Sequence, residues 1–493
     1  RYSASWLNSA QTTIHSDTRT GEILNASILI NANMISVQYA DRIGATVAID
    51  PRVRTTVFPQ EIQGELIQAA IAQAVGTGLG LTMNWGASCA YPVDSLRSAS
   101  FTQKYGLASS VMGGVIINDV ATEEDVRNGV CLVNAKPGPY DELVIKYLYQ
   151  PIYASSLQEE KETLDSWIRE HTGDPYYAYI RNQSRFDSDP RNSRGSLGDD
   201  HLKSFDYMLP NVRKGFENYY SWFAKEDRDF LMRRRVHSAL SERLSGRIYA
   251  ILSYIGGIYL NDIREKDAIP SYSMVDREKQ KAALSKALEL AKNLDWVDDT
   301  AHLNEFEISD KKADRLRLDI FNGIFGRLPY VEVCTERFPD AAYTASEYLD
   351  DIYGIVWEGV LKHRPLENFE RALQTAFLES IISTSTATAP IGSFKASKTG
   401  FAATGKPEIN LAALRNGGKV DMKMYSLQNA EEVAGFSSIP PIYTNQTKIA
   451  AYYFDLLMRT KDMLKKAIST APEADRSHYD LLIYRINKAT EIE

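Results

Sequence analysis

The side chains that most often hold metals or act as nucleophiles are scattered along this sequence. The two nearest of its seven histidines are 30 residues apart: His15, His171, His201, His237, His302, His363 and His478. The cysteines lack the C-x-x-C spacing of metal or redox sites, and no G-x-S-x-G turn prepares a serine nucleophile. No local group therefore predicts a metal centre or a hydrolase triad, although a metal site assembled from distant residues stays open.

One stretch looks like a phosphate-binding loop but lacks a required residue. Gly400, Gly405 and Lys406 have the right spacing, yet Pro407 stands where a magnesium-binding Ser or Thr is needed. We interpret residues 384–407, together with 181–200, as irregular surface loops, because small and turn-forming residues dominate both.

The most informative stretch is residues 73–83, Gln-Ala-Val-Gly-Thr-Gly-Leu-Gly-Leu-Thr-Met. Taken alone it predicts a helix that ends in a glycine-rich turn, since each glycine lowers helix propensity by about 1 kcal/mol relative to Ala. The alternative is the frame H-E-x-x-H-x-x-G-x-x-H, in which three His bind zinc and Glu activates water. In that frame Gln73, Thr77 and Met83 replace the three His, Ala74 replaces Glu, and the bend glycine, Gly80, remains.

Blocks on both sides of this stretch favour the second interpretation. In their order and spacing they resemble a family of exported bacterial zinc-dependent metalloprotease-like proteins of metzincin type, found in Gram-negative anaerobes. The blocks are DTRTGEIL (17–24), GELIQAAIAQ (64–73), LGLTMN (79–84), GAS (86–88), YPVDSLRS (91–98), FTQKYG (101–106), PYDELVIKYLYQPI (139–152), DPRNSRGSLGDD (189–200), GGIY (256–259) and REKQKAAL (277–284).

The resemblance implies a zinc site that this chain has lost. A catalytic zinc needs three ligands from His, Cys or carboxylate side chains, but here an amide, a hydroxyl and a thioether take those positions. The family's methionine turn, Ser-Ile-Met-Asp-Tyr, corresponds to residues 110–114, where Met112 remains and Gly114 replaces the Tyr. We therefore expect no metal, no cofactor and no catalytic residue in this chain, although zinc is expected of the family.

Three functions follow as hypotheses. The first is an inactive homologue that binds a peptide or protein in the former active-site cleft, where the ligand would pair with an edge strand carrying Asn25 and Ser27. The second is an active peptidase with a rebuilt metal site, which requires His and carboxylates to converge near Gln73. The third is an interaction scaffold of the cell envelope, dominated by the helical part of the chain.

Composition sets the remaining limits. The 493 residues carry a net charge of −8, and no basic stripe with interleaved aromatics suggests nucleic acid as a partner. No apolar run has the roughly 20 residues of a membrane span. The sequence opens without a signal peptide, so export to the periplasm or outer membrane is implied by the resemblance alone. Nothing fixes the oligomeric state or the disulfide state of Cys89, Cys131 and Cys334.

The predicted fold class is α+β, with a zincin-like α/β domain over 1–155 and a mostly helical domain over 156–493. Alternating apolar residues predict a strand near 24–30, and 34–39 stays open between strand and helix. Apolar residues at helical spacing predict helices at 60–75, 141–149, 156–171, 211–223, 228–260, 276–294, 313–325, 345–361, 366–382, 448–468 and 474–490.

Overall fold

The computed structural model describes residues 2–3, 10–31, 34–180, 188–192, 195–261, 263, 267, 269–302, 312–385 and 446–490. The phosphate-loop-like stretch at 400–406 lies outside these residues, as do residues 181–187 and 386–407 of the two predicted loops. The mixture of many helices with small sheets is an α+β fold, as predicted.

A small sheet and a long helix open the fold. The sheet has the order β1-β3-β2, with β1 (Tyr2–Ser3) parallel and β2 (Gln11–Ser16) antiparallel to β3 (Ile23–Asn31). The stretch left open at 34–39 begins helix α1 (Met34–Thr46), and the glycine-rich stretch ends helix α2 (Gln60–Gly78). Buried Ile62, Leu66, Ala69 and Ala70 recur at helical spacing along α2 and seat it on the core.

Short elements connect this part to the helices that follow. They are η1 (Pro51–Val53), η2 (Ala87–Cys89), η3 (Val93–Arg97), α3 (Ala99–Tyr105), η4 (Val111–Gly113), α4 (Glu123–Arg127), α5 (Pro139–Tyr149), α6 (Leu157–Arg169), η5 (Pro175–Tyr177) and η6 (Pro190–Asn192). The Ser156 hydroxyl caps α6 by accepting from the backbone N–H of Glu159, at the start of the helix predicted over 156–171.

Helices dominate the rest of the chain. They are α7 (His201–Phe223), α8 (Leu231–Leu252), α9 (Arg277–Lys292), α10 (Lys312–Gly326), α11 (Leu328–Arg337), α12 (Ala345–Val356), α13 (Glu358–Leu361), α14 (Asn368–Ser385), α17 (Gln446–Ala467) and α18 (Glu473–Thr490). Between them lie the β4 (Ile258–Leu260) and β5 (Tyr272–Met274) hairpin and η7 (Asp295–Val297).

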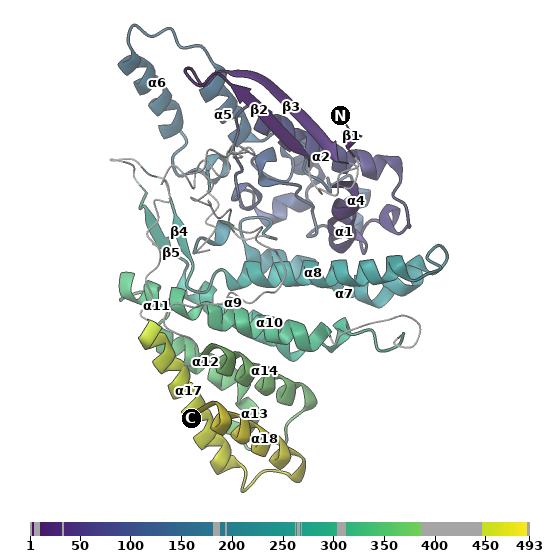
Figure 1. Cartoon of the computed structure of the whole chain (residues 1–493), viewed down its shortest axis with the longest axis vertical. Helices are drawn as coiled ribbons and strands as arrows, with labels where there is room; N and C mark the ends of the chain where they lie inside the picture. Colours follow the sequence, from purple (N-terminus) through teal and green to yellow (C-terminus); the bar gives the residue numbers. More distant parts are fainter. Residues whose placement is uncertain are drawn as a thin grey trace, which may run out of the picture.

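One hydrophobic core joins the two predicted domains. In Figure 1, α7 and α8 cross the middle of the molecule, with the sheet, α2, α5 and α6 on one side and α12, α14, α17 and α18 on the other. The same core cluster contains Ile62 of α2, Leu240 of α8 and Ile486 of α18. Helices α1 and α8 approach so closely that a Cβ at Gly44 would lie 2.5 Å from the backbone oxygen of Ala239. The boundary at residue 155 stays a prediction.

Two predicted helices are wrong at their ends. Helix α7 starts ten residues before the predicted start because Pro210 is accommodated inside it, and the Asp200 carboxylate caps its first turn. The helix predicted over 228–260, with an interruption at Gly256-Gly257, stops at Leu252 and does not resume. Gly256 has φ +61, and any Cβ there would lie 2.5 Å from the backbone nitrogen of Val331, so the chain turns and continues as β4.

Candidate functional site

Helix α2 ends in a sharp bend at the glycine-rich stretch. The N–H of Leu81 donates to the carbonyl of Gly76 at 3.0 Å, and the N–H of Gly80 donates to the carbonyl of Thr77 at 2.9 Å. This pair of bonds is a Schellman motif, which requires a left-handed residue just beyond the helix. Gly80 supplies it with φ +91. The bend returns residues 81–83 toward the helix that they have just left.

The bend brings together two of the positions that the predicted frame assigns to zinc ligands. The side-chain amide of Gln73 donates to the thioether sulfur of Met83 at 2.9 Å. One turn along α2, the Thr77 hydroxyl donates to the backbone carbonyl of Gln73 at 3.2 Å. Ala74, at the position of the catalytic Glu, is buried, and its carbonyl accepts from the Thr12 hydroxyl at 3.0 Å. Met83 packs against a small cluster of buried Leu81, Val111 and Met112.

The methionine turn lies directly against this helix. Met112 is fully buried in η4, and a Cβ added at Gly76 of α2 would lie only 2.5 Å from its sulfur. Gly114 follows with φ +90, and no atom lies within 4 Å of where its Cβ would stand. The position at which the resemblance implies a Tyr is therefore open space here.

A buried carboxylate on α5, which the sequence analysis missed, holds the methionine turn in place. Asp141 accepts from the Ser110 hydroxyl at 2.5 Å and from the backbone N–H groups of Val111 and Gly138, both at 2.9 Å. The Ser110 hydroxyl oxygen in turn accepts from the N–H of Met112 at 2.9 Å. The available signal was an Asp at the start of the helix predicted over 141–149, where such a residue usually serves only as part of a cap.

This pairing of a bent helix with a methionine turn agrees with a comparison to known families. Residues 55–364, more than half of the chain, match the model of a family described as Met-zincin. The chain belongs to the Met-zincin family. Its fold is therefore metallopeptidase-like. Neither the curated proteins nor the solved structures contain a match to the chain.

The zinc that the Met-zincin family implies does not fit these side chains. In a tetrahedral site with bonds of roughly 2.1 and 2.3 Å, two ligand atoms stand about 3.6 Å apart. The Gln73 nitrogen and the Met83 sulfur are 2.9 Å apart, and an N–H rather than a lone pair lies between them. Across the part of the chain that the structure describes, no group of three or more His, Cys, Asp or Glu side chains could hold a metal ion.

The sheet lies over the same helix, but the strand expected at its edge is wrong. Asn25 and Ser27 lie on β3, the middle strand, where they pair with His15 and Thr13 of β2. The outer strand is β2, which the sequence analysis did not recognise because its six residues include only one large aliphatic side chain, Ile14. Among the described residues, β2 pairs with β3 alone.

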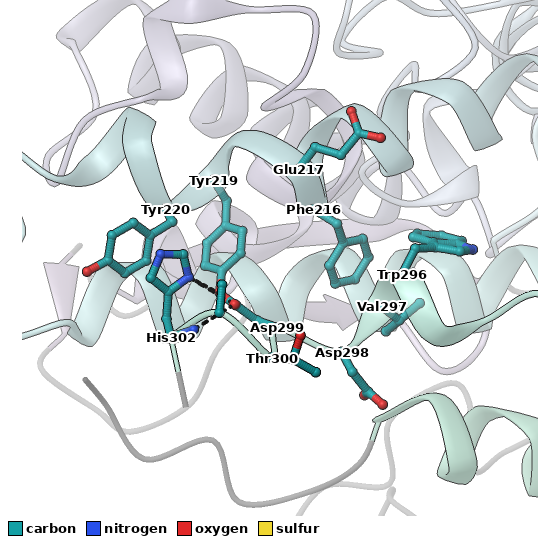
Figure 2. Close-up of a pocket in the computed structure, with 11 residues that line it drawn as sticks. Phe216, Glu217, Tyr219, Tyr220, Trp296, Val297, Asp298, Asp299, Thr300 and His302 are labelled. Atoms are coloured by element: carbon teal, nitrogen blue, oxygen red, sulfur yellow. Dashed lines mark hydrogen bonds and ion pairs between the residues drawn. The ribbon is translucent and has the colours of Figure 1, made fainter. Parts of the chain in front are cut away.

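A separate cavity of about 200 Å³ lies between α7 and the segment that begins at η7 (Figure 2). Its centre is the Asp299 carboxylate, which accepts from the Tyr219 hydroxyl and lies 2.9 Å from Nδ1 of His302 through each oxygen. The His302 ring stacks on Tyr220 at 3.5 Å. Burial would raise the pKa of Asp299, but the hydrogen bonds from Tyr219 and His302 outweigh it, so this pKa is lowered. These contacts fasten residues 298–302 to α7 and include none of the zinc-motif positions.

Within the described residues no helix is both long enough and apolar enough to cross a membrane.

Proposed function

We propose that this protein is a catalytically inactive Met-zincin that binds a peptide or protein segment in the region of the family's active-site cleft. The contact between Gln73 and Met83 carries the proposal, because the predicted frame assigns both residues to zinc ligands and their side chains instead bind each other. Three further features support it. Ala74 offers no proton acceptor, Thr77 directs its hydroxyl proton to the backbone, and Gly114 removes the Tyr that could polarise a scissile carbonyl.

Peptide binding does not require the lost chemistry. An extended peptide can add to the outer strand of a sheet through main-chain hydrogen bonds alone. Strand β2 is the outer strand here, and it is fixed over α2 by the bond from Thr12 to Ala74. A peptide paired with β2 would therefore lie along the same helix that bears Gln73 and Thr77.

Metal analysis and a peptidase assay test the loss of catalysis. We expect less than about one zinc per ten chains after purification in zinc-containing buffer, and no cleavage of a mixed peptide library with or without added zinc. Stoichiometric zinc whose binding is lost in Met83→Ala, or cleavage abolished by a chelator, would overturn the proposal.

A binding assay tests the second part of the proposal, that the protein binds a peptide along β2. We expect a random peptide library to contain sequences that the full chain retains, and Thr13→Pro on β2 to reduce that retention, since proline removes a backbone donor from the strand. Thr18→Pro, in the turn that follows β2, is the control, because the substitution is the same but lies outside the strand. Retention that Thr13→Pro leaves unchanged would refute binding along β2.

The resemblance to exported proteins also leads us to propose that the protein works in the periplasm or at the outer membrane. Fractionation of cells that produce the full-length protein tests this, and recovery in the cytoplasm alone would refute it.

A further inference from the structure

Large apolar side chains are exposed around the bend at Gly80. Leu79 is 41% exposed, Leu24 of β3 is 65% exposed, and Leu148 and Tyr149 at the end of α5 are 47% and 50% exposed. These segments meet at one point. The methyl groups of Ile23 and Leu148 lie 3.6 and 3.9 Å from where a Cβ on Gly80 would stand, and the Tyr149 hydroxyl donates to the Leu79 carbonyl at 2.7 Å. We call Leu24, Leu79, Leu148 and Tyr149 the Gly80 patch.

The apolar surface continues along the chain from this patch. Tyr153 is 97% exposed and Leu157, the first residue of α6, is 85% exposed. Figure 1 shows the β2–β3 hairpin, α5 and α6 together at one end of the molecule. Single exposed apolar residues are ordinary, but the four of the Gly80 patch come from three segments that meet at one bend, which is typical of an interaction site.

Negative charge predominates on two segments at the same end of the molecule as the patch, the β2–β3 turn and the first turns of α6. Among the cations nearby, Arg19 is paired with Asp17 at 2.8 Å, and Lys146 lies over the Trp167 ring at 4.4 Å. The third cation in this region is Lys161, near the start of α6. The bordering carboxylates outnumber these cations even without Asp17: they are Glu22, next to Ile23, and Glu159, Glu160 and Glu162 of α6. A ligand with basic residues would complement this border.

From the patch and its charged border we infer that the site selects extended peptides that carry a bulky apolar side chain flanked by Lys or Arg. The peptide backbone would pair with β2, its apolar side chain would cover the Gly80 patch, and its basic residues would face the carboxylates of α6 and Glu22. This inference rests on the proposed peptide-binding function and names the class of ligand for it.

Selection from a phage-displayed library of random dodecapeptides on the immobilised full chain tests the inference. We expect enrichment of Leu, Phe or Tyr next to Lys or Arg. The enriched peptide, made synthetically and labelled, is then measured by fluorescence anisotropy. Its affinity should fall about tenfold in Leu148→Glu, because the apolar contact is lost and covering the new carboxylate with an apolar side chain costs more than its attraction to Lys or Arg returns. High salt should weaken binding to the unmodified chain, because it screens the attraction between exposed charges.

Leu481→Glu is the matched control. Leu481 is also helical and 47% exposed, but it lies on α18, far from β2 in the sequence. Its affinity should stay within about twofold of the unmodified chain. Circular dichroism establishes that both variants are folded.

The outcomes separate the inference from the function on which it rests. No enrichment of any peptide would overturn both. Enrichment of polar or acidic peptides, or equal affinity in Leu148→Glu and Leu481→Glu, would overturn the apolar and basic selectivity while peptide binding itself stands.

Discussion

The contact between Gly76 and the methionine turn makes a sharp prediction for the substitution Gly76→Ala. The new Cβ would lie 2.5 Å from the Met112 sulfur, whereas unstrained contacts between such atoms are about 3.5–4 Å. Met112 is fully buried, so its thioether cannot move into solvent and must press on its neighbours. Overpacking of this kind costs about 1–3 kcal/mol. The gain from replacing a helical glycine is about 1 kcal/mol, so the variant should be destabilised by up to about 2 kcal/mol.

Gly64→Ala in the same helix is the matched control. No atom lies within 4 Å of its new Cβ, so only the helix-propensity gain remains and this variant should be stabilised by about 1 kcal/mol. Urea-induced unfolding followed by tryptophan fluorescence compares the two. The free energies of unfolding should therefore differ by about 1–3 kcal/mol.

A double-mutant cycle identifies the cause. Met112→Ala alone should cost about 2–5 kcal/mol, since a fully buried side chain is lost. In that background the clash is gone, so Gly76→Ala should stabilise the protein as Gly64→Ala does. If Gly76→Ala is as stabilising as Gly64→Ala with Met112 present, the methionine turn does not pack on α2 as described.

Three further predictions concern the anchor of the turn, pH and the motif register. Asp141→Asn should lower the free energy of unfolding by about 1–3 kcal/mol, because the buried carboxylate accepts from three N–H or O–H groups and the new amide places a donor among them. Glu142→Gln, at the exposed neighbouring residue, should change it by less than about 0.5 kcal/mol, and equal effects would contradict the anchoring role. Burial lowers the pKa of His201 to about 4, so the unfolded chain takes up a proton at this residue at a higher pH than the folded protein does. The free energy of unfolding should therefore fall as pH drops from about 6.5 to about 4. His201→Gln should make this fall with pH less steep, and an unchanged pH dependence would refute the prediction. The fourfold variant Gln73→His, Ala74→Glu, Thr77→His, Met83→His should bind about one zinc per chain by elemental analysis, and a folded variant without zinc would show that the frame is misaligned.

The local features of the site follow from the sequence because short-range chemistry determines them. Gly80 predicts the bend, since only glycine readily adopts the left-handed conformation that a Schellman motif requires. Apolar spacing predicts α2, and the cap residues Ser156 and Asp276 mark the starts of α6 and α9. The predicted motif frame at residues 73–83 likewise depends only on the order and spacing of residues within one segment.

Other features depend on which distant segments meet, and sequence reasoning misplaced or missed them. Asn25 and Ser27 were expected on the outer strand, but strand order depends on the pairing of β2 with β3. In the sequence Asp141 is recognisable only as a residue at the start of a helix, whereas in the fold its carboxylate accepts a hydrogen bond from Ser110. The helix predicted at 211–223 begins just after Pro210, yet burial of Phe205 and Met208 on the preceding turns extends α7 back to His201.

The sequence by itself determined which side chains stand at 73, 74, 77 and 83, the positions that the predicted motif frame assigns to the zinc ligands and the catalytic Glu: Gln73, Ala74, Thr77 and Met83. Only the tertiary structure decided that Gln73 and Met83 contact each other, that Met112 lies under Gly76, and that β2 is the outer strand above them. These contacts join residues from separate segments, and the free energy of packing those segments together, rather than any local preference, sets their geometry.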